Sequence, residues 1–300
     1  MPVPTTLLIA GNGAIGSRVA SRMAEKGCDV LVHHTGRRVV PQARNIAEIR
    51  AAPSPAPIRT FPPALLERKF DVAIHFYCMG RPDAEAFIDA FDGLAVRLVL
   101  ISSCDVYRAY GRFIGTEPGP PDPTPLDEGA PLRARLHPYR TRAAHEDAVE
   151  HWYEKLNAER IVASARKSEF VILRLPKVYG PDTNEHLGTI YGFAHQPAWR
   201  WTHGHADNVA AAVSLAALHP KAAREIFNLG EADTPTIGER LTDLLPRRGF
   251  PIAPGDYDFA QNMHCDTSKV RRVLGYRDEV DEGAAMRVVA GARRADPEHS

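Results

Sequence analysis

Short apolar runs and longer segments with helical spacing alternate along the first half of the chain. The apolar runs lie at residues 7–9, 28–34, 70–76 and 96–103. Short runs that are hydrophobic throughout are typical of parallel strands buried on both faces. Between the last two runs, residues 84–94 repeat an apolar position every three or four residues, which predicts a helix. This alternation predicts a parallel sheet covered by helices.

The second half continues the pattern over fewer elements. Residues 170–181 and 225–231 predict two more strands, and residues 206–218 predict a helix that Asp207 could cap. Residues 143–167 form one long helical pattern. We therefore predict an α/β fold with a Rossmann-type, doubly wound, mostly parallel sheet of about seven strands.

A proline-rich stretch interrupts this rhythm. Six prolines and three glycines lie between Gly115 and Arg133. So many residues that favour turns predict an ordered or lid-like loop, not a linker between domains. Helical patterns return near 235–246 and 266–274, and we expect them to form a small C-terminal cap.

The composition is that of an ordinary globular chain, with 300 residues of which 44% are hydrophobic and 25% charged. The 37 basic and 37 acidic residues cancel, so nothing directs the chain to nucleic acid or to an anionic membrane. The four cysteines lack the spacing of zinc ligands, so we expect reduced thiols in a cytoplasmic protein. We see no signal peptide and no apolar run as long as a membrane span.

A glycine-rich turn follows the first apolar run. It consists of Gly11, Asn12, Gly13, Ala14, Ile15 and Gly16. In this pattern the first glycine permits a tight turn, the second lets a pyrophosphate approach the backbone, and the third lets the helix pack closely against the strand. The N-terminus of the helix then faces the phosphates. These six residues are therefore predicted to bind a dinucleotide.

The end of the second predicted strand indicates which dinucleotide. Proteins that bind NAD usually have an acidic residue there, which holds the ribose hydroxyls. This chain has His34 at that place, followed by Arg37 and Arg38. Two guanidinium groups suit a 2′-phosphate, so the sequence favours NADP over NAD, although both stay open. The alternative is that the arginines only form a solvated basic loop.

Five segments, in order, resemble the extended short-chain dehydrogenase/reductase group, the NAD-dependent epimerase/dehydratase family. They are "ISSCDVY", "EKLNAERIV", "LRLPKVYGP", "HADNVAAA" and "DTSKVRRVLGY". The resemblance runs almost from end to end. With the predicted elements, it leads us to expect a dinucleotide-binding domain over 1–181, to which 204–230 return. Residues 182–203 and 231–300 should then form a small substrate-binding region.

The resemblance also implies roles for individual residues. Ser103 maps to the family's serine or threonine, whose hydroxyl binds the substrate oxygen. Lys155 maps to the lysine that binds the nicotinamide ribose and lowers the pKa of a catalytic tyrosine. Pro176 and Val178 lie in the segment near the nicotinamide, and they and Tyr77 are further predicted contacts of the cofactor.

The family's tyrosine stands four residues before the lysine, and this chain has His151 there. On a continuous helix, residues four apart share a face and residues two apart do not, so Tyr153 should face away from Lys155. The segment "APLRARLHPYR" resembles the family's approach to its tyrosine and indicates Tyr139. We therefore predict that Tyr139 or His151 supplies any acid/base group, and that Tyr153 is structural. The alternative is that Tyr139 and His151 only pack.

Three more residues are candidates for contacts with a substrate. Asp105 lies two residues after Ser103, where the dehydratase branch of the family has an acid that assists the loss of water. It could instead cap the local turn. Lys177 and Tyr179 lie where the chain leaves the sheet, and ligands of open parallel sheets gather there. A lysine at that point suits an anionic substrate such as a diphosphate, or it is simply exposed.

His203, His205 and Asp207 would share one face of a strand, which could suggest a metal. However, His205 falls where the family often has a histidine with no metal role, and Asp207 suits a helix cap. We therefore predict no metal site.

These features predict NAD(P)-dependent oxidoreduction, epimerisation or dehydration of a sugar nucleotide or a similar polar small molecule. The alternative is an NAD(P)-binding protein without turnover, in which the nucleotide serves structure or regulation. We expect a small-molecule substrate as the partner, neither nucleic acid nor a membrane, and we allow for a homodimer.

Overall fold

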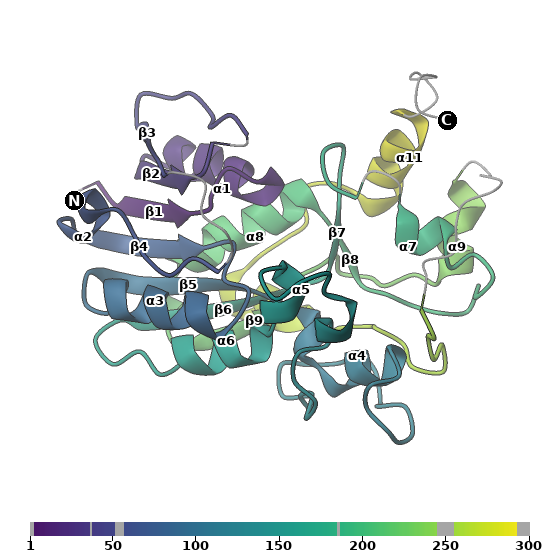
Figure 1. Ribbon diagram of the computed structural model, residues 1–300. Helices are drawn as coiled ribbons and strands as arrows, with labels where there is room; N and C mark the ends of the chain where they lie inside the picture. Colours follow the sequence, from purple (N-terminus) through teal and green to yellow (C-terminus); the bar gives the residue numbers. More distant parts are fainter. Residues whose placement is uncertain (1–2, 37, 52–56, 185–186, 245–254, 293–300) are drawn as a thin grey trace.

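The computed structural model describes residues 3–36, 38–51, 57–184, 187–244 and 255–292. Its centre is a seven-stranded parallel sheet with the strand order β3-β2-β1-β4-β5-β6-β9 (Figure 1). The strands are β1 (Thr5–Ile9), β2 (Asp29–His34), β3 (Ile46–Arg50), β4 (Phe70–His75), β5 (Ala95–Ser103), β6 (Glu169–Leu175) and β9 (Glu225–Asn228). The predicted fold class is confirmed.

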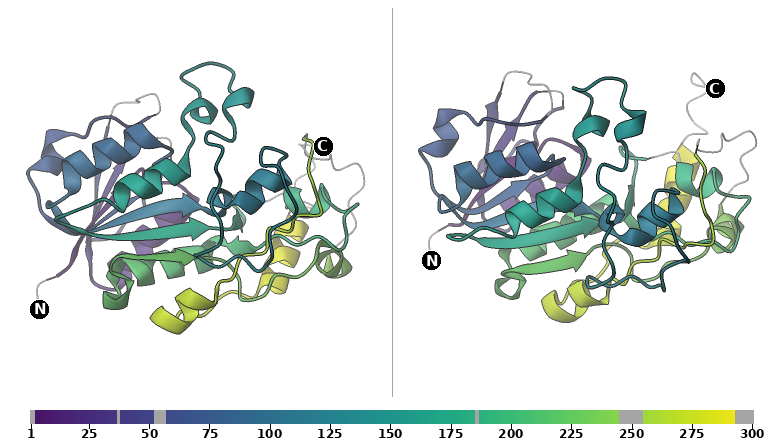
Figure 2. Two further views of the ribbon diagram at one scale, coloured as in Figure 1. Left: turned by 90° about the horizontal axis from the view of Figure 1, so that it is seen from below. Right: turned by 60° about the horizontal axis from the view of Figure 1, so that its bottom comes forward.

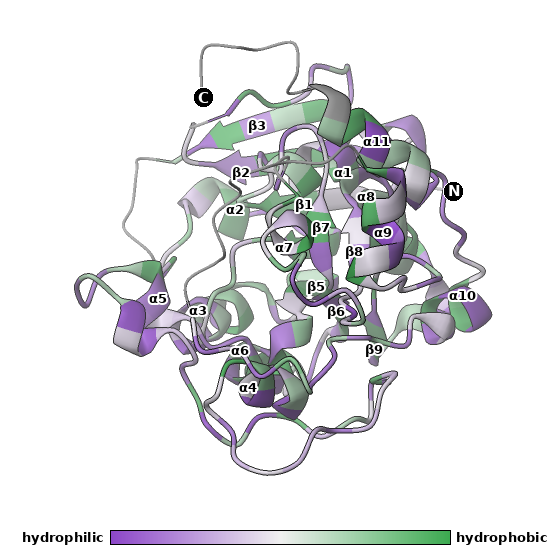
Figure 3. Cartoon of the chain, turned by 90° about the vertical axis from the view of Figure 1, so that its right-hand side faces the viewer, coloured by the Kyte–Doolittle hydropathy of each residue, from purple (hydrophilic) through white to green (hydrophobic). Residues whose placement is uncertain are grey.

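Helices cover both faces of the sheet. On one face, α1 (Ala14–Glu25) and α8 (Ala206–Leu218) share a core with the strands, and on the other face α3 (Arg81–Phe91) and α6 (Lys155–Val162) do so. Figure 2 shows α3 and α6 on one side of the sheet and α8 on the other, and Figure 3 shows the same layers from the side of the C-terminal region. The apolar stripes of these helices therefore bury the strands, as their spacing predicts.

A smaller lobe lies beyond the carboxyl ends of the strands (Figure 1). It contains a two-stranded sheet and four helices: β7 (Lys177–Tyr179), β8 (His203–His205), α4 (Arg108–Phe113), α7 (Gly188–Tyr191), α9 (Ile237–Asp243) and α11 (Glu282–Ala292). Its core is aromatic, with Phe113 stacked between Trp199 and Tyr257 at 4.8 Å from each ring. The domain boundaries given above stay a prediction.

The remaining elements are short, apart from α10. They are α2 (Pro63–Leu66), α5 (Val149–Trp152), α10 (Ser268–Leu274) and 3-10 turns at Cys104–Val106, Arg140–Arg142 and Pro220–Ala222. The helices expected near 235–246 and 266–274 correspond to α9 and α10. The edge strand β3 and the helices α4 and α11 were not apparent in the hydropathy pattern.

The cap of α8 differs from the prediction. The ring of His205, not the carboxylate of Asp207, caps the helix, because His205 Nδ1 accepts from the main-chain N–H of Asp207 at 3.3 Å. The Asp207 carboxylate instead receives Arg18 Nε at 2.8 Å. It joins α8 to α1, so tertiary pairing has replaced a local cap.

The prediction of one continuous helix over 143–167 is wrong. Within this range the chain forms α5 and α6, with Tyr153 extended and Glu154 non-helical between the two helices. The main-chain N–H of Glu154 donates to the carbonyl of Met79 at 2.7 Å instead of continuing a helix. Its carboxylate lies 3.0 Å from Arg133, and both side chains are fully buried. A buried ion pair tolerates little misplacement, so it overrides the helical preference of two residues.

The proline-rich stretch is an ordered loop, as predicted. Leu126 exchanges main-chain hydrogen bonds with His264 and Asp266, at 2.8 Å each. The loop ends at Arg133, whose side chain forms the ion pair with Glu154. The segment that follows, with α5, projects from the body of the molecule in both views of Figure 2.

Candidate functional site

The glycine turn has the geometry that its sequence predicts. A side chain at Gly11 would come within 2.5 Å of Leu8 Cβ, and one at Gly16 within 2.3 Å of the carbonyl oxygen of Gly11. A side chain at Gly13 would meet nothing within 4 Å. Gly11 and Gly16 therefore allow close packing, while Gly13 leaves open space at the start of α1.

That space adjoins a free helix N-terminus. α1 has no side-chain cap and no acidic residue in its first turn. Its first N–H groups and its dipole are therefore available to an anion. The turn fits the pyrophosphate of a dinucleotide on this ground.

His34 is held inside the edge of the sheet. Its Nε2 lies 3.2 Å from a carboxylate oxygen of Glu48, and its Nδ1 accepts from the N–H of Gly36 at 2.8 Å. Both ring nitrogens are therefore engaged, and neither is left for a ribose hydroxyl. The sequence prediction of His34 as a cofactor contact has no support in this geometry.

The basic loop after β2 is tied to the glycine turn. Asn12 Nδ2 donates to the carbonyl of Arg38 at 3.0 Å, and the Arg38 side chain is exposed. Arg37 lies outside the described residues. The guanidinium of Arg50, at the end of β3, packs across Gly36. Arg50 is thus a third arginine near this edge, which the sequence prediction did not include.

A cavity of about 190 Å³ lies at the carboxyl end of β5. It is lined by Ser103, Cys104, Asp105, Tyr110, Tyr139, Tyr153, Leu175, Pro176, Lys177, Trp201 and Met263. We call it the catalytic cavity, after the role that the sequence analysis predicts for Ser103 and Tyr139. Of the predicted residues, it brings together Ser103, Asp105, Tyr139, Pro176 and Lys177.

Hydrogen bonds link three of the lining residues. The phenol of Tyr153 donates to Asp105 Oδ2 at 2.6 Å, and the main-chain N–H of Asp105 donates to Ser103 Oγ at 3.2 Å. Ser103 and Tyr153 line the same cavity. Burial, followed by the nearby charge of Asp105, raises the pKa of Tyr153 well above its ordinary value. Tyr153 is therefore a protonated phenol at neutral pH.

A second phenol reaches the same carboxylate. Tyr139 Oη lies 3.1 Å from Asp105 Oδ2 and 2.8 Å from the phenol oxygen of Tyr110. Each phenol has one proton, so Tyr110 donates to Tyr139 when Tyr139 donates to Asp105. The Tyr139 and Tyr153 rings lie 4.9 Å apart.

Lys155 lies beneath this cluster, at the start of α6. Its Nζ donates to the carbonyls of Cys78 and Ile101 at 2.9 Å each, and it lies 6.0 Å from the centre of the Tyr153 ring. The residue is only 4% exposed, and burial lowers its pKa. The break before α6 turns Tyr153 towards Lys155, so the inference that they face opposite ways was wrong.

His151 does not line the catalytic cavity. It lies on α5, where its ring packs against Trp152 and its carbonyl accepts from Arg140 Nε at 3.2 Å. Tyr153, predicted to be structural, lines the cavity together with Tyr139. The sequence has no proline or glycine between 149 and 157 to mark the break, so no local signal could have found it.

Lys177 brings positive charge to the catalytic cavity. Its Nζ lies 5.7 Å from the Trp201 ring, and burial lowers its pKa. Within the described residues, no carboxylate lies within ion-pair distance of it. A half-buried ammonium without a counter-ion is suited to an anionic ligand.

The other predicted contacts lie elsewhere. Tyr179 is fully buried in the lobe, where its ring packs against His203 and His205, so it does not line the catalytic cavity. Val178 packs against the core under α8. Tyr77 is half-buried just after β4.

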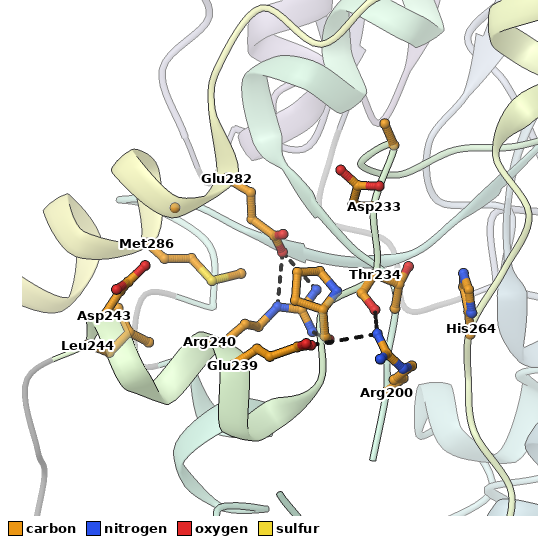
Figure 4. A pocket seen from close by; sticks show the side chains of 13 residues that line it. Arg200, Asp233, Thr234, Glu239, Arg240, Asp243, Leu244, His264, Glu282 and Met286 are labelled. Carbon is orange, nitrogen blue, oxygen red and sulfur yellow. Dashed lines mark hydrogen bonds and ion pairs between the residues drawn. The ribbon is translucent and has the colours of Figure 1, made fainter. Parts of the chain in front are cut away.

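A second cavity of about 750 Å³ lies in the lobe (Figure 4). We call it the lobe cavity. It is lined by Arg200, Ala232, Asp233, Thr234, Pro235, Glu239, Arg240, Asp243, Leu244, His264, Glu282, Gly283 and Met286. Arg200 and His264 line it, while their chain neighbours Trp201 and Met263, which form a bridge, line the catalytic cavity. Successive side chains of extended chain point to opposite sides, so this bridge separates the two cavities.

No group of metal ligands is found among the residues that the structure describes. Both ring nitrogens of His203 are engaged, with Thr189 at 2.9 Å and with the Trp201 carbonyl at 2.8 Å. None of the described helices has the length and apolar character needed to cross a membrane.

Solved structures with the same fold cover nearly the whole chain. MoeE5 in complex with UDP-glucuronic acid and NAD is 17% identical, with a TM-score of 0.66 over 97% of this chain and 100% of that one. The UDP-glucose 4-epimerase of Thermotoga maritima, with UDP-glucose, is 14% identical, with a TM-score of 0.68 over 97% and 99%.

A short-chain dehydrogenase/reductase superfamily protein from Agrobacterium tumefaciens with bound NAD is 18% identical, with a TM-score of 0.65 over 97% of each chain. No protein-family model and no curated protein matches the chain. At these identities the likeness shows a shared fold.

Proposed function

We propose that the protein catalyses NAD(P)-dependent oxidoreduction, epimerisation or dehydration at a hydroxyl-bearing carbon of a polar small molecule, such as a sugar nucleotide. One observation carries the proposal. The Ser103 hydroxyl, the Tyr153 phenol and the Lys155 ammonium converge at the carboxyl end of β5. Solved structures of the same fold that hold NAD or UDP-sugars support it.

The residues present fit a dinucleotide. The pyrophosphate would lie at the start of α1 over Gly13, and the nicotinamide ribose would lie towards Lys155. When bound, the nicotinamide would accept or return a hydride. NAD and NADP both remain candidates, with Arg38 the described residue that favours NADP.

The chain's own residues would handle the substrate. Ser103 would hold the reacting oxygen by a hydrogen bond, and Tyr153 would exchange a proton with it. Lys177 would attract an anionic part of the substrate, such as a phosphate or carboxylate. The apolar wall of Leu175 and Pro176 would keep water from the reacting carbon.

A second candidate function is nucleotide binding without turnover. Lys155 favours it, because two of its three N–H donors already serve main-chain carbonyls. A lysine so engaged can hold a fold together without lowering the pKa of a phenol. The two functions differ in whether Tyr153 matters for anything beyond stability.

Calorimetric titration with NAD and NADP, followed by incubation with a panel of UDP-hexoses and UDP-uronic acids, tests the proposal. We expect micromolar nucleotide binding, weakened in Lys155→Ala, and turnover that Tyr153→Phe abolishes. Binding without turnover of any compound in the panel would favour the second function. If neither nucleotide binds, both functions are excluded.

A further inference from the structure

Asp105 is a buried acid in the catalytic cavity, and the proposed function so far gives it no role. It is 6% exposed, and its Oδ2 receives Tyr153 at 2.6 Å and Tyr139 at 3.1 Å. Its Oδ1 is buried and has no hydrogen-bond partner within the described part of the chain. The carboxylate therefore accepts two hydrogen bonds at Oδ2 and can still accept others at Oδ1.

Among the residues that the structure describes, no cation lies within ion-pair distance of this carboxylate. Arg133 lies nearby, but its Nε donates to the main-chain carbonyl of Asp105 at 2.6 Å, and its charge is paired with Glu154. The titratable and charged groups that face Asp105 are Tyr153, Tyr139, Tyr110, Cys104, Arg133, Lys155 and Lys177. Burial outweighs the cations among them and raises the pKa of Asp105. The titration of this carboxyl group is therefore moved towards neutral pH.

The phenol of Tyr153 cannot easily lose its proton on its own. Burial and the charge of Asp105 both raise its pKa, and the Lys155 ammonium is bound to two carbonyls. A substrate hydroxyl that donates to the Tyr153 oxygen could nevertheless push the phenol proton across the 2.6 Å contact to Asp105.

We propose that Asp105 is the proton acceptor behind Tyr153, so that the two residues act as one acid/base pair. This rests on the proposed function. In the oxidation direction, the substrate O–H bond breaks and its proton goes to the Tyr153 oxygen. The proton of Tyr153 moves to Asp105 Oδ2, and the hydride leaves the same carbon for an oxidised nicotinamide. The products would be a carbonyl compound, a reduced nicotinamide, a phenol and a neutral carboxylic acid, and reduction would return the hydride and each proton by the same path.

The first test reads the phenol directly and needs no substrate. NMR titration of protein labelled at the tyrosine Cζ, with Tyr153→Phe to assign the signal, gives the pKa of Tyr153. We expect that pKa to lie above about 10, the ordinary phenol value, in the unaltered protein. We expect it to fall by about one unit or more in Asp105→Asn, because the negative charge is gone while Lys155 remains.

Tyr139→Phe is the matched control. It removes the other phenol from Asp105 and should leave the pKa of Tyr153 high. A Tyr153 pKa at or below about 8 in the unaltered protein would overturn the proposal. So would a pKa that does not change in Asp105→Asn. The pKa of Tyr153 in the unaltered protein can still be measured if the Asp105→Asn variant does not fold.

The second test is the pH profile of turnover. The rate of oxidation should rise with pH through the ionisation of Asp105, because only the carboxylate can accept the proton, and reduction should fall over the same range. In Asp105→Asn this dependence of the rate on pH should disappear, kcat should fall on the order of a hundredfold, and KM should change little. An unchanged profile contradicts the proposal. If no substrate turns over, the proposed function fails, and the NMR titration still decides whether Asp105 controls Tyr153.

Discussion

The two cavities on either side of the Trp201–Met263 bridge use charge in different ways. In the catalytic cavity, Lys177 has no ion-pair partner within the described part of the chain, and Asp105 is held by phenols. In the lobe cavity, Arg240 pairs with Glu282 at 2.8 Å, and Arg200 lies 3.7 Å from Glu239 (Figure 4). Charge is thus left unpaired in one cavity and neutralised in the other.

The difference indicates that the charged residues of the two cavities have different roles. Burying a charge without a counter-ion costs free energy, and proteins tolerate that cost mainly where the group binds or reacts. A paired arginine and glutamate instead join elements, as Arg240 of α9 and Glu282 of α11 do. We therefore assign chemistry to the catalytic cavity and assembly of the lobe to the pairs around the larger one.

The largest expected effect concerns the phenols of the catalytic cavity. Tyr153→Phe should reduce turnover by on the order of a hundredfold or more, because it removes the phenol that would exchange a proton with the substrate. Tyr139→Phe, which removes a phenol from the same carboxylate, should cost less than about tenfold. Steady-state kinetics of both variants decide the matter, and a larger loss in Tyr139→Phe would return the acid/base role to Tyr139.

The next effect concerns the pairing in the lobe. Arg240→Met should lower the free energy of unfolding by about 2–3 kcal/mol, because it leaves the Glu282 carboxylate, which is only 14% exposed, without its partner. Arg200→Met should lower it by less than about 1 kcal/mol, because that pair is long and largely exposed. Urea unfolding followed by tryptophan fluorescence gives both values. Equal losses would mean that the buried pair does not hold the lobe together.

A smaller effect should follow from the unpaired ammonium. Lys177→Met should raise KM for an anionic substrate by about tenfold with little change in kcat, whereas Lys177→Arg should keep most of the affinity. Burial lowers the pKa of Lys177, so the charge is lost below the ordinary value for lysine as pH rises, and KM should increase there. A KM that is the same for Lys177→Met and the parent would remove Lys177 from the site.

The smallest effect concerns the choice of cofactor. Arg38→Ala should weaken NADP binding by about fivefold and leave NAD binding unchanged, because an exposed arginine contributes only about 1 kcal/mol to a phosphate contact. Arg44→Ala, in the same loop and also exposed, serves as the control. Calorimetry with both nucleotides gives the ratio. If Arg38→Ala lowers the affinity for both nucleotides alike, Arg38 does not read the 2′-phosphate.

The sheet was predictable because strands buried on both faces must be apolar throughout. The runs that predict β1, β2, β4 and β5 need no knowledge of their neighbours. The same holds for Gly11 and Gly16, since the crowding at each comes from residues less than six positions away. The surroundings of His34 could not be predicted in this way. Its ring contacts Glu48 of β3, and the sequence of β3 has no clear apolar pattern.

The amino-acid sequence by itself determined the α/β sheet and the glycine turn, because each depends on local spacing, and the resemblance of its motifs indicated Ser103 and Lys155. Only the tertiary structure decided that Tyr153 enters the catalytic cavity beside Tyr139. Arg133, at the end of the proline-rich loop, pairs with Glu154 in the core and breaks the helix there. That break turns Tyr153 onto Asp105. The outcome depends on a buried ion pair between residues 21 positions apart, which no periodicity along the chain records.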